Sequence, residues 1–182
     1  MIPIEWILLY LVPATLVFFF ATRERSVKAR SIIVHVGLII SIVLLTIAGA
    51  QLRERFQAVP LLCLFGATLI ALYLLSKIGI AYAASSIIQE YCLLLSAILL
   101  AYQTRILWAA LLSALVYAGA HLIDRGHWQS KFFITLTWGI CSILLYFWIQ
   151  QPLFNFAIHI IGGSLLIKKG ILWTSKDHLI NS

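Results

Sequence analysis

One carboxylate and two histidines lie inside apolar segments, and they are the strongest indication of chemistry in this sequence. Glu90 stands in the middle of residues 78–102, a stretch that is otherwise mostly apolar or small. Moving an ionisable side chain to the centre of a bilayer costs at least about 2.5 kcal/mol, so such residues usually face a bundle interior and serve a reaction or a pathway. His121 and His159 lie on later apolar segments. We therefore expect the three side chains to form a buried polar site.

Polar or small residues recur at four-residue spacing on three of the apolar segments. Residues four apart on a helix lie on the same face. The sets are Ser86 with Glu90, Tyr117 with His121, and Asn155 with His159 and Gly163. Three helices that each present a polar stripe in an apolar background predict a site assembled from several helices.

The composition predicts an all-α, polytopic membrane protein. Of the 182 residues, 63% are hydrophobic and only 10% are charged, and apolar runs of membrane-spanning length recur along the chain. A transmembrane helix needs about 20 residues. Residues 1–182 therefore hold about seven transmembrane helices in a single transmembrane domain, with no separate soluble domain.

We predict seven spans, the first three of which lie within residues 1–77. They are Ile4–Ala21, Ser31–Ala50, Pro60–Ser76, Ile78–Tyr102, Ile106–Ile123, Phe132–Ile149 and Leu153–Ile167. Pro60 and Pro152 suit the first turn of a helix, where the missing N–H costs nothing. Pro13 should kink the first span. That span should stay as an anchor, because its positive charges follow the apolar run.

The distribution of Lys and Arg predicts the orientation in the membrane. Of the thirteen, ten fall on the side of the loop 23–30, and only Arg53, Arg55 and Arg105 lie on the other side. Short cytoplasmic loops retain Lys and Arg, so the N-terminus should be outside and the C-terminus cytoplasmic. The net charge of +7 then reflects topology and contact with the anionic lipid bilayer, and it calls for no nucleic acid partner.

Other residues are expected to have structural roles. Five tryptophans should form two interfacial belts: Trp6, Trp108 and Trp148 on one side, and Trp128 and Trp173 on the other. The three cysteines, at unrelated spacings, match no disulfide or metal pattern and should be packing residues: Cys63, Cys92 and Cys141. His35 has no evident polar companion at helical spacing, so we expect it to be structural or lipid-facing.

The order of the polar motifs resembles the CAAX prenyl protease and bacteriocin-processing family, also called the Abi family, of glutamic intramembrane endopeptidases. Residues 87–94 resemble the first motif, 117–121 the second and 159–163 the third, and the likeness covers about residues 80–165. The chain also departs from the family. Gln89 and Leu94 replace the first glutamate and the arginine of the first motif, and Gly163 replaces the asparagine of the third.

The resemblance implies that Glu90 and His121 activate a water molecule for attack on a peptide carbonyl, and that His159 stabilises the oxyanion. Asn155 would replace the missing asparagine donor, with Gln89, Tyr117 and Gly163 in supporting positions. No metal or other cofactor is implied. The substrate would be a membrane-associated protein or peptide, and the location the inner (cytoplasmic) membrane of a prokaryote.

Several alternatives stay open. Gln89 fits a divergent active enzyme, a catalytically silent relative, or an introduced glutamate-to-glutamine change. A silent relative would be an accessory or assembly subunit with a membrane partner subunit. Two histidines and one carboxylate are also a legitimate zinc or iron ligand set, although no H-E-x-x-H motif is present. Haem ligation by His121 and His159 is the last alternative, and their unequal depths count against it.

Overall fold

All elements in the described part of the chain are helical, as predicted. The computed structural model describes residues 4–48, 80–123 and 128–169. The helices are α1 (Ile4–Trp6), η1 (Ile7–Leu11), α2 (Val12–Arg23), α3 (Val27–Ala48), α5 (Ile80–Ala101), α6 (Ile106–Ala120), η3 (His121–Ile123), α7 (Trp128–Ile149) and α8 (Pro152–Lys168). Six predicted spans thus correspond to described helices, and the predicted span Pro60–Ser76 lies outside the described residues.

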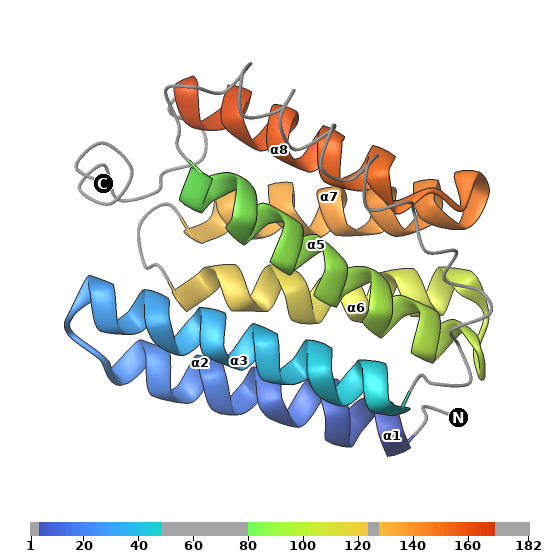
Figure 1. Ribbon diagram of the computed structural model, residues 1–182, viewed down its shortest axis with the longest axis horizontal. Coiled ribbons are helices and arrows are strands. Elements are labelled where there is room, and N and C mark those ends of the chain that lie inside the picture. Colours follow the sequence, from blue (N-terminus) through green and yellow to red (C-terminus); the bar gives the residue numbers. More distant parts are fainter. Residues whose placement is uncertain (1–3, 49–79, 124–127, 170–182) are drawn as a thin grey trace.

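The long helices lie side by side, and α5 is the central one (Figure 1). Helices α2 and α3 form an antiparallel pair, and α6, α7 and α8 run in alternating directions along the other side. Helix α5 contacts α3, α6, α7 and α8. Residues 92–100 of α5 are all buried. Any polar group in the middle of α5 must therefore find its partners on neighbouring helices.

The helix surfaces fit a membrane protein. Three described helices are long and apolar enough to cross a membrane, over Lys28–Leu45, Tyr82–Ala101 and Gln129–Ile149. Three shorter apolar helical stretches cover Ile7–Arg23, Ile106–Ala120 and Pro152–Ile167. Large apolar side chains face outward along these helices, among them Leu16, Phe20, Val36, Ile40, Val43, Leu107, Phe133 and Leu165. An apolar outer surface is what contact with lipid requires.

The two prolines in the described helices lie in the first turns of α2 and α8. Pro13 is the second residue of α2, and α2 directly follows the π-helical turn η1. Proline removes one backbone donor, and a π-helical turn is one way to absorb such an interruption. Pro152 is the first residue of α8, as predicted. Just before it, Gln150 has φ 56°, a left-handed conformation that ends α7 and reverses the chain.

Small residues allow the helices to approach closely. A methyl group at Gly37 of α3 would overlap the Val17 side chain of α2. At Gly139 of α7 it would lie 2.9 Å from Ala114 Cβ of α6. Ala110 and Ala118 flank Ala114 on the same buried face of α6. In lipid, helix association depends on such close packing, because the lipid tails are as apolar as the side chains.

Two predictions for apolar residues were wrong in part. Trp108 and Trp148 are exposed near the same end of the molecule, as an interfacial belt requires, but Trp6 is only 2% exposed. Its indole N–H donates to Ser96 Oγ at 2.9 Å, so Trp6 belongs to the interior. Cys92 is a buried packing residue as expected, whereas Cys141 is exposed because it lies on the outward face of α7.

The Gly37 contact generates a first prediction. Gly37→Ala should lower the free energy of unfolding by about 1–3 kcal/mol, because the stiff Val17 side chain cannot move aside without strain. Gly162→Ala is the matched control, since a methyl group there meets no other side chain within 4 Å. Thermal unfolding of the purified protein in detergent measures both. Equal stability of the two variants would contradict the close α2–α3 contact.

Candidate active site

Glu90 is the centre of a buried polar cluster. Its side chain is 0% exposed, and it lies near the middle of α5, where α7 and α8 pack against that helix. The Ser142 hydroxyl donates a short hydrogen bond to Glu90 Oε1. Glu90 Oε2 accepts from Trp138 Nε1 at 3.2 Å and from His159 Nδ1 at 2.6 Å. The buried carboxylate is thus bonded on both oxygens by donors from two other helices.

Helix α7 supplies two of these donors from a polar face that our sequence analysis missed. Lys131, Thr135, Trp138 and Ser142 follow one another at spacings of four, three and four residues, so they lie on one side of the helix. Lys131, Thr135 and Ser142 are buried. This spacing was visible in the sequence, but tryptophan and serine are common in membrane helices and gave no reason to single it out.

Asn155 holds Ser142 in place. The Asn155 amide nitrogen donates to Ser142 O at 2.7 Å and to Ser142 Oγ at 2.6 Å. Both amide hydrogens are therefore engaged within the site. Asn155 is 1% exposed, and within the described residues its Oδ1 has no hydrogen-bond partner. As arranged, Asn155 orients Ser142 toward Glu90, which differs from the free oxyanion donor that we expected.

His159 is the third side chain that hydrogen-bonds to Glu90. Its imidazole lies edge-on to Trp138, with ring centroids 5.4 Å apart, and edge-on to Tyr117 at 6.4 Å. An ionised carboxylate only accepts hydrogen bonds, so His159 Nδ1 carries the hydrogen when Glu90 is charged. The side chain of His159 is 11% exposed while that of Glu90 is fully enclosed. His159 therefore lies between the carboxylate and the outside of the cluster.

His121 is held differently from His159. Its Nδ1 lies 2.9 Å from the backbone oxygen of Tyr117, and its ring lies against the Tyr117 ring with centroids 4.6 Å apart. A carbonyl oxygen can only accept, so Nδ1 donates and Nε2 carries the lone pair of a neutral imidazole. Glu90 and His159 are in direct contact, whereas His121 reaches this cluster through the ring of Tyr117, which contacts both histidines.

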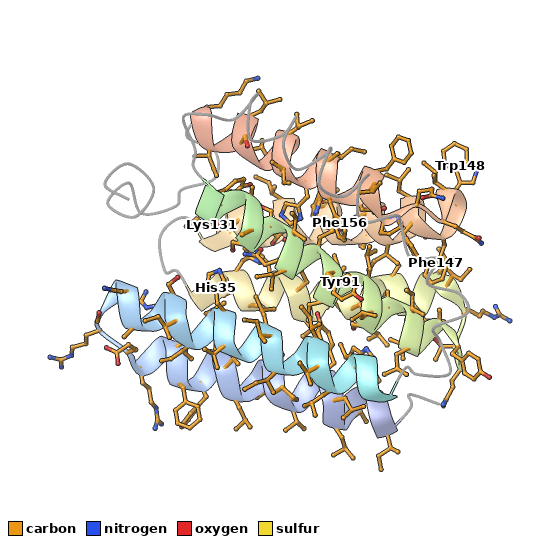
Figure 2. The ribbon with its side chains drawn as sticks, in the orientation of Figure 1. His35, Tyr91, Lys131, Phe147, Trp148 and Phe156 are labelled. Atoms are coloured by element: carbon orange, nitrogen blue, oxygen red, sulfur yellow. The ribbon has the colours of Figure 1, made fainter. Side chains whose placement is uncertain are left out.

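Gln89 points to a second network, on the side of α5 that faces α3. Gln89 Nε2 donates to Ser85 Oγ at 2.9 Å, and Ser85 Oγ lies 2.8 Å from His35 Nε2. His35 Nδ1 in turn lies 2.7 Å from the backbone oxygen of Ser31. Our prediction that His35 lacks polar companions was wrong. Ser31 stands four residues earlier on α3, and Ser85 comes from α5, which the spacing of α3 could not indicate. Figure 2 labels His35 on α3.

Gly163 lies where the third motif of the protease family has asparagine. A methyl group at Gly163 would overlap the hydroxyl of Tyr82, and it would lie 3.9 Å from His159 Cδ2. The Tyr82 hydroxyl of α5 thus occupies space beside His159 that a larger residue at position 163 would need. The Tyr82 hydroxyl therefore fills the space that a side chain at position 163 would take.

Within residues 4–48, 80–123 and 128–169, no three His, Cys, Asp or Glu side chains are grouped closely enough to hold a metal ion. Comparison of the chain with protein-family models, with curated proteins and with solved structures gives no match.

The contact between Gly163 and Tyr82 generates a second prediction. Gly163→Ala should destabilise the protein by about 1–3 kcal/mol through overpacking. In a Tyr82→Phe background the cost should fall, because the overlapping oxygen is gone. A double-mutant cycle on thermal unfolding in detergent measures the coupling between the two sites. Additive effects of the two substitutions would show that Tyr82 does not fill the space beside Gly163.

Proposed function

We propose that this protein is a membrane-embedded endopeptidase of the glutamic type, which hydrolyses a peptide bond in a membrane-associated protein or peptide. The contact that supports this most is the 2.6 Å approach of His159 Nδ1 to Glu90 Oε2. These residues are 69 positions apart, and both were predicted from the sequence as members of one site. A buried carboxyl group in contact with an imidazole can transfer protons near neutral pH.

In the proposed reaction Glu90 is the general base. A carboxylate has about four acceptor positions, and Ser142, Trp138 and His159 occupy three of them. The remaining position would take a proton from the attacking water, while the Nε2 lone pair of His121 orients that water. The oxygen of the water bonds to the peptide carbonyl carbon and gives a tetrahedral intermediate. When this intermediate collapses, the carbon–nitrogen bond breaks and the proton held by Glu90 passes to the leaving amine.

His159 would stabilise the oxyanion in this scheme. With Nδ1–H bonded to Glu90, a protonated His159 has Nε2–H left to donate to the developing negative charge. Loss of one such donor costs about 2.7–4 kcal/mol in other hydrolases. Glu90 would hold the His159 ring in place through the Nδ1 contact, so the two residues act as a unit.

The seven-span topology is part of the proposal. The α3 and α5 helices run in the same direction (Figure 1). In a membrane, two successive helices with the same direction require an odd number of further membrane crossings between them. The predicted span Pro60–Ser76 would provide one such crossing. Most described Lys and Arg positions lie at one end of the helices: Arg23, Arg25, Lys28, Arg30, Lys131 and Lys169, with Arg105 at the other end. By the positive-inside rule, that end is cytoplasmic, the N-terminus is outside, and a prokaryotic inner membrane would hold the protein.

Cysteine labelling provides the third prediction and tests this orientation. Ser26 and Gln103 are exposed in turns at opposite ends of the helices. In a background without the three native cysteines, a membrane-impermeant thiol reagent added to intact cells should label Gln103→Cys and spare Ser26→Cys. The reverse pattern would invert the proposed topology.

Substitution of Glu90 provides the fourth prediction. Glu90→Gln should abolish processing of the native substrate, because an amide cannot accept the proton from water. The fold should survive, since the amide oxygen can accept from Trp138 and His159 while its nitrogen donates to the Ser142 hydroxyl. Processing and thermal stability are measured on the same preparations. Cys141→Ala, on the exposed face of α7, is the matched control.

The two histidines distinguish the proposed roles further. His159→Ala should lower kcat more than it raises KM, since an oxyanion contact strengthens in the transition state. His121→Ala should likewise remove most activity. Gln89→Glu restores the paired glutamates of the family, and a large gain in activity would assign the base to position 89. Full activity of Glu90→Gln would refute the glutamic mechanism.

One observation favours a second candidate, a catalytically silent accessory subunit. Glu90 is 0% exposed, and both of its oxygens are already bonded within the protein. Such a carboxylate can also serve to fix α5, α7 and α8 relative to one another. In that case the wild type would show no proteolysis, Glu90→Gln would change the stability little, and the protein would co-purify with a larger membrane partner. Absence of proteolysis in the wild type together with such a partner would decide for this candidate.

A further inference from the structure

A second polar site lies at the turn between α2 and α3, at the end of the bundle where the positive charges gather. Thr22, Arg23, Glu24, Arg25 and Arg30 line a hollow of about 530 Å³. We infer that this hollow binds a phosphate anion, of the kind that the headgroup of an anionic lipid carries. The inference is independent of the proposed peptidase activity.

Two of the three guanidinium groups are fixed before any ligand arrives. The Arg23 guanidinium carbon lies 3.7 Å from the centre of the Phe19 ring, which is cation–π geometry. Arg30 Nη2 donates to the backbone oxygen of Glu24 at 3.1 Å. Because these side chains are already held, binding an anion costs less conformational entropy than it would with free arginines.

The lining of the hollow carries an excess of positive charge and a hydrogen-bond donor that a ligand could use. Its lining holds three arginines against one glutamate, and the Glu24 carboxylate accepts the backbone N–H of Ser26 at 2.8 Å. Within the described residues, Arg30 Nε is buried and has no hydrogen-bond partner. A buried donor without an acceptor is costly. An anion in the hollow would supply the missing acceptor.

The location favours phosphate carried by a lipid. The hollow lies at one end of α2 and α3. The outer faces of these helices carry exposed apolar side chains, including Phe18, Phe19 and Phe20 on α2. Acyl chains could lie along these faces while the headgroup enters the hollow. Guanidinium groups bind phosphate through paired hydrogen bonds, and basic pockets at the membrane surface recognise anionic headgroups.

The test measures binding of short-chain phosphatidylglycerol to the purified full-length protein, by native mass spectrometry and by ligand-induced thermal stabilisation. Parallel arms use phosphatidylcholine of the same chain length, inorganic phosphate, and a fatty acid that has a charge but no phosphate. We expect saturable binding of phosphatidylglycerol and weak binding of the fatty acid. Displacement by millimolar inorganic phosphate would indicate a soluble phosphate as the source, and no displacement would indicate the lipid.

Four variants make the test specific. Arg30→Gln should weaken phosphatidylglycerol binding about tenfold, as loss of a charge-assisted hydrogen bond does. Arg25→Gln, on an exposed turn, should weaken it as well and covers the case that Arg30→Gln fails to fold. Lys28→Gln removes a charge at the same end but outside the lining, and Arg105→Gln removes one at the opposite end. Equal loss in Lys28→Gln and Arg30→Gln, or equal binding of the fatty acid, would overturn the proposal.

Discussion

The structure depends on satisfying one buried carboxylate inside an apolar helix bundle. An unpaired ionised group in such an interior costs several kcal/mol, and removing one partner from a buried charged pair typically costs about 3–5 kcal/mol. Glu90 therefore requires donors within hydrogen-bonding distance, and within the described residues they come from neighbouring helices. The donors come from Trp138 and Ser142 on α7 and from His159 on α8. This requirement fixes both the rotation of α7 and the position of α8 along α5.

Close packing makes these contacts possible. Short hydrogen bonds between side chains on different helices need backbones that approach closely, and small residues at the crossings permit this. Gly139 of α7, which directly follows Trp138 in the sequence, packs against Ala114 of α6. The outer faces of the same helices carry exposed Leu, Ile, Val and Phe side chains. The bundle thus has a largely apolar core around the Glu90 cluster and an apolar outer surface as well, and the latter distinguishes it from a water-soluble bundle.

Helix positions were predictable because hydropathy alone determines them. The predicted span Ile106–Ile123 matches α6 and η3, and Phe132–Ile149 lies within α7. Glu90 and His159 were predictable as partners because ionisable residues in apolar helices must find each other. Trp138 and Ser142 were not, since neither type is unusual in a membrane helix and only the rotation of α7 brings them to Glu90. In the network from His35 to Gln89, the four-residue spacings Ser31–His35 and Ser85–Gln89 were visible in the sequence. The contact between His35 and Ser85 was not, because it joins two helices.

The partners of Glu90 determine how its carboxylate can exchange a proton with the surroundings. A proton shared between Glu90 and His159 can reside on either partner, over a separation of 2.6 Å, without changing the net charge of the pair. Trp138 is a donor only and cannot take the proton, and both amide hydrogens of Asn155 are engaged with Ser142. Glu90 is fully enclosed, whereas the His159 side chain keeps 11% exposure. In the substrate-free arrangement, proton exchange between Glu90 and its surroundings is therefore expected to pass through His159.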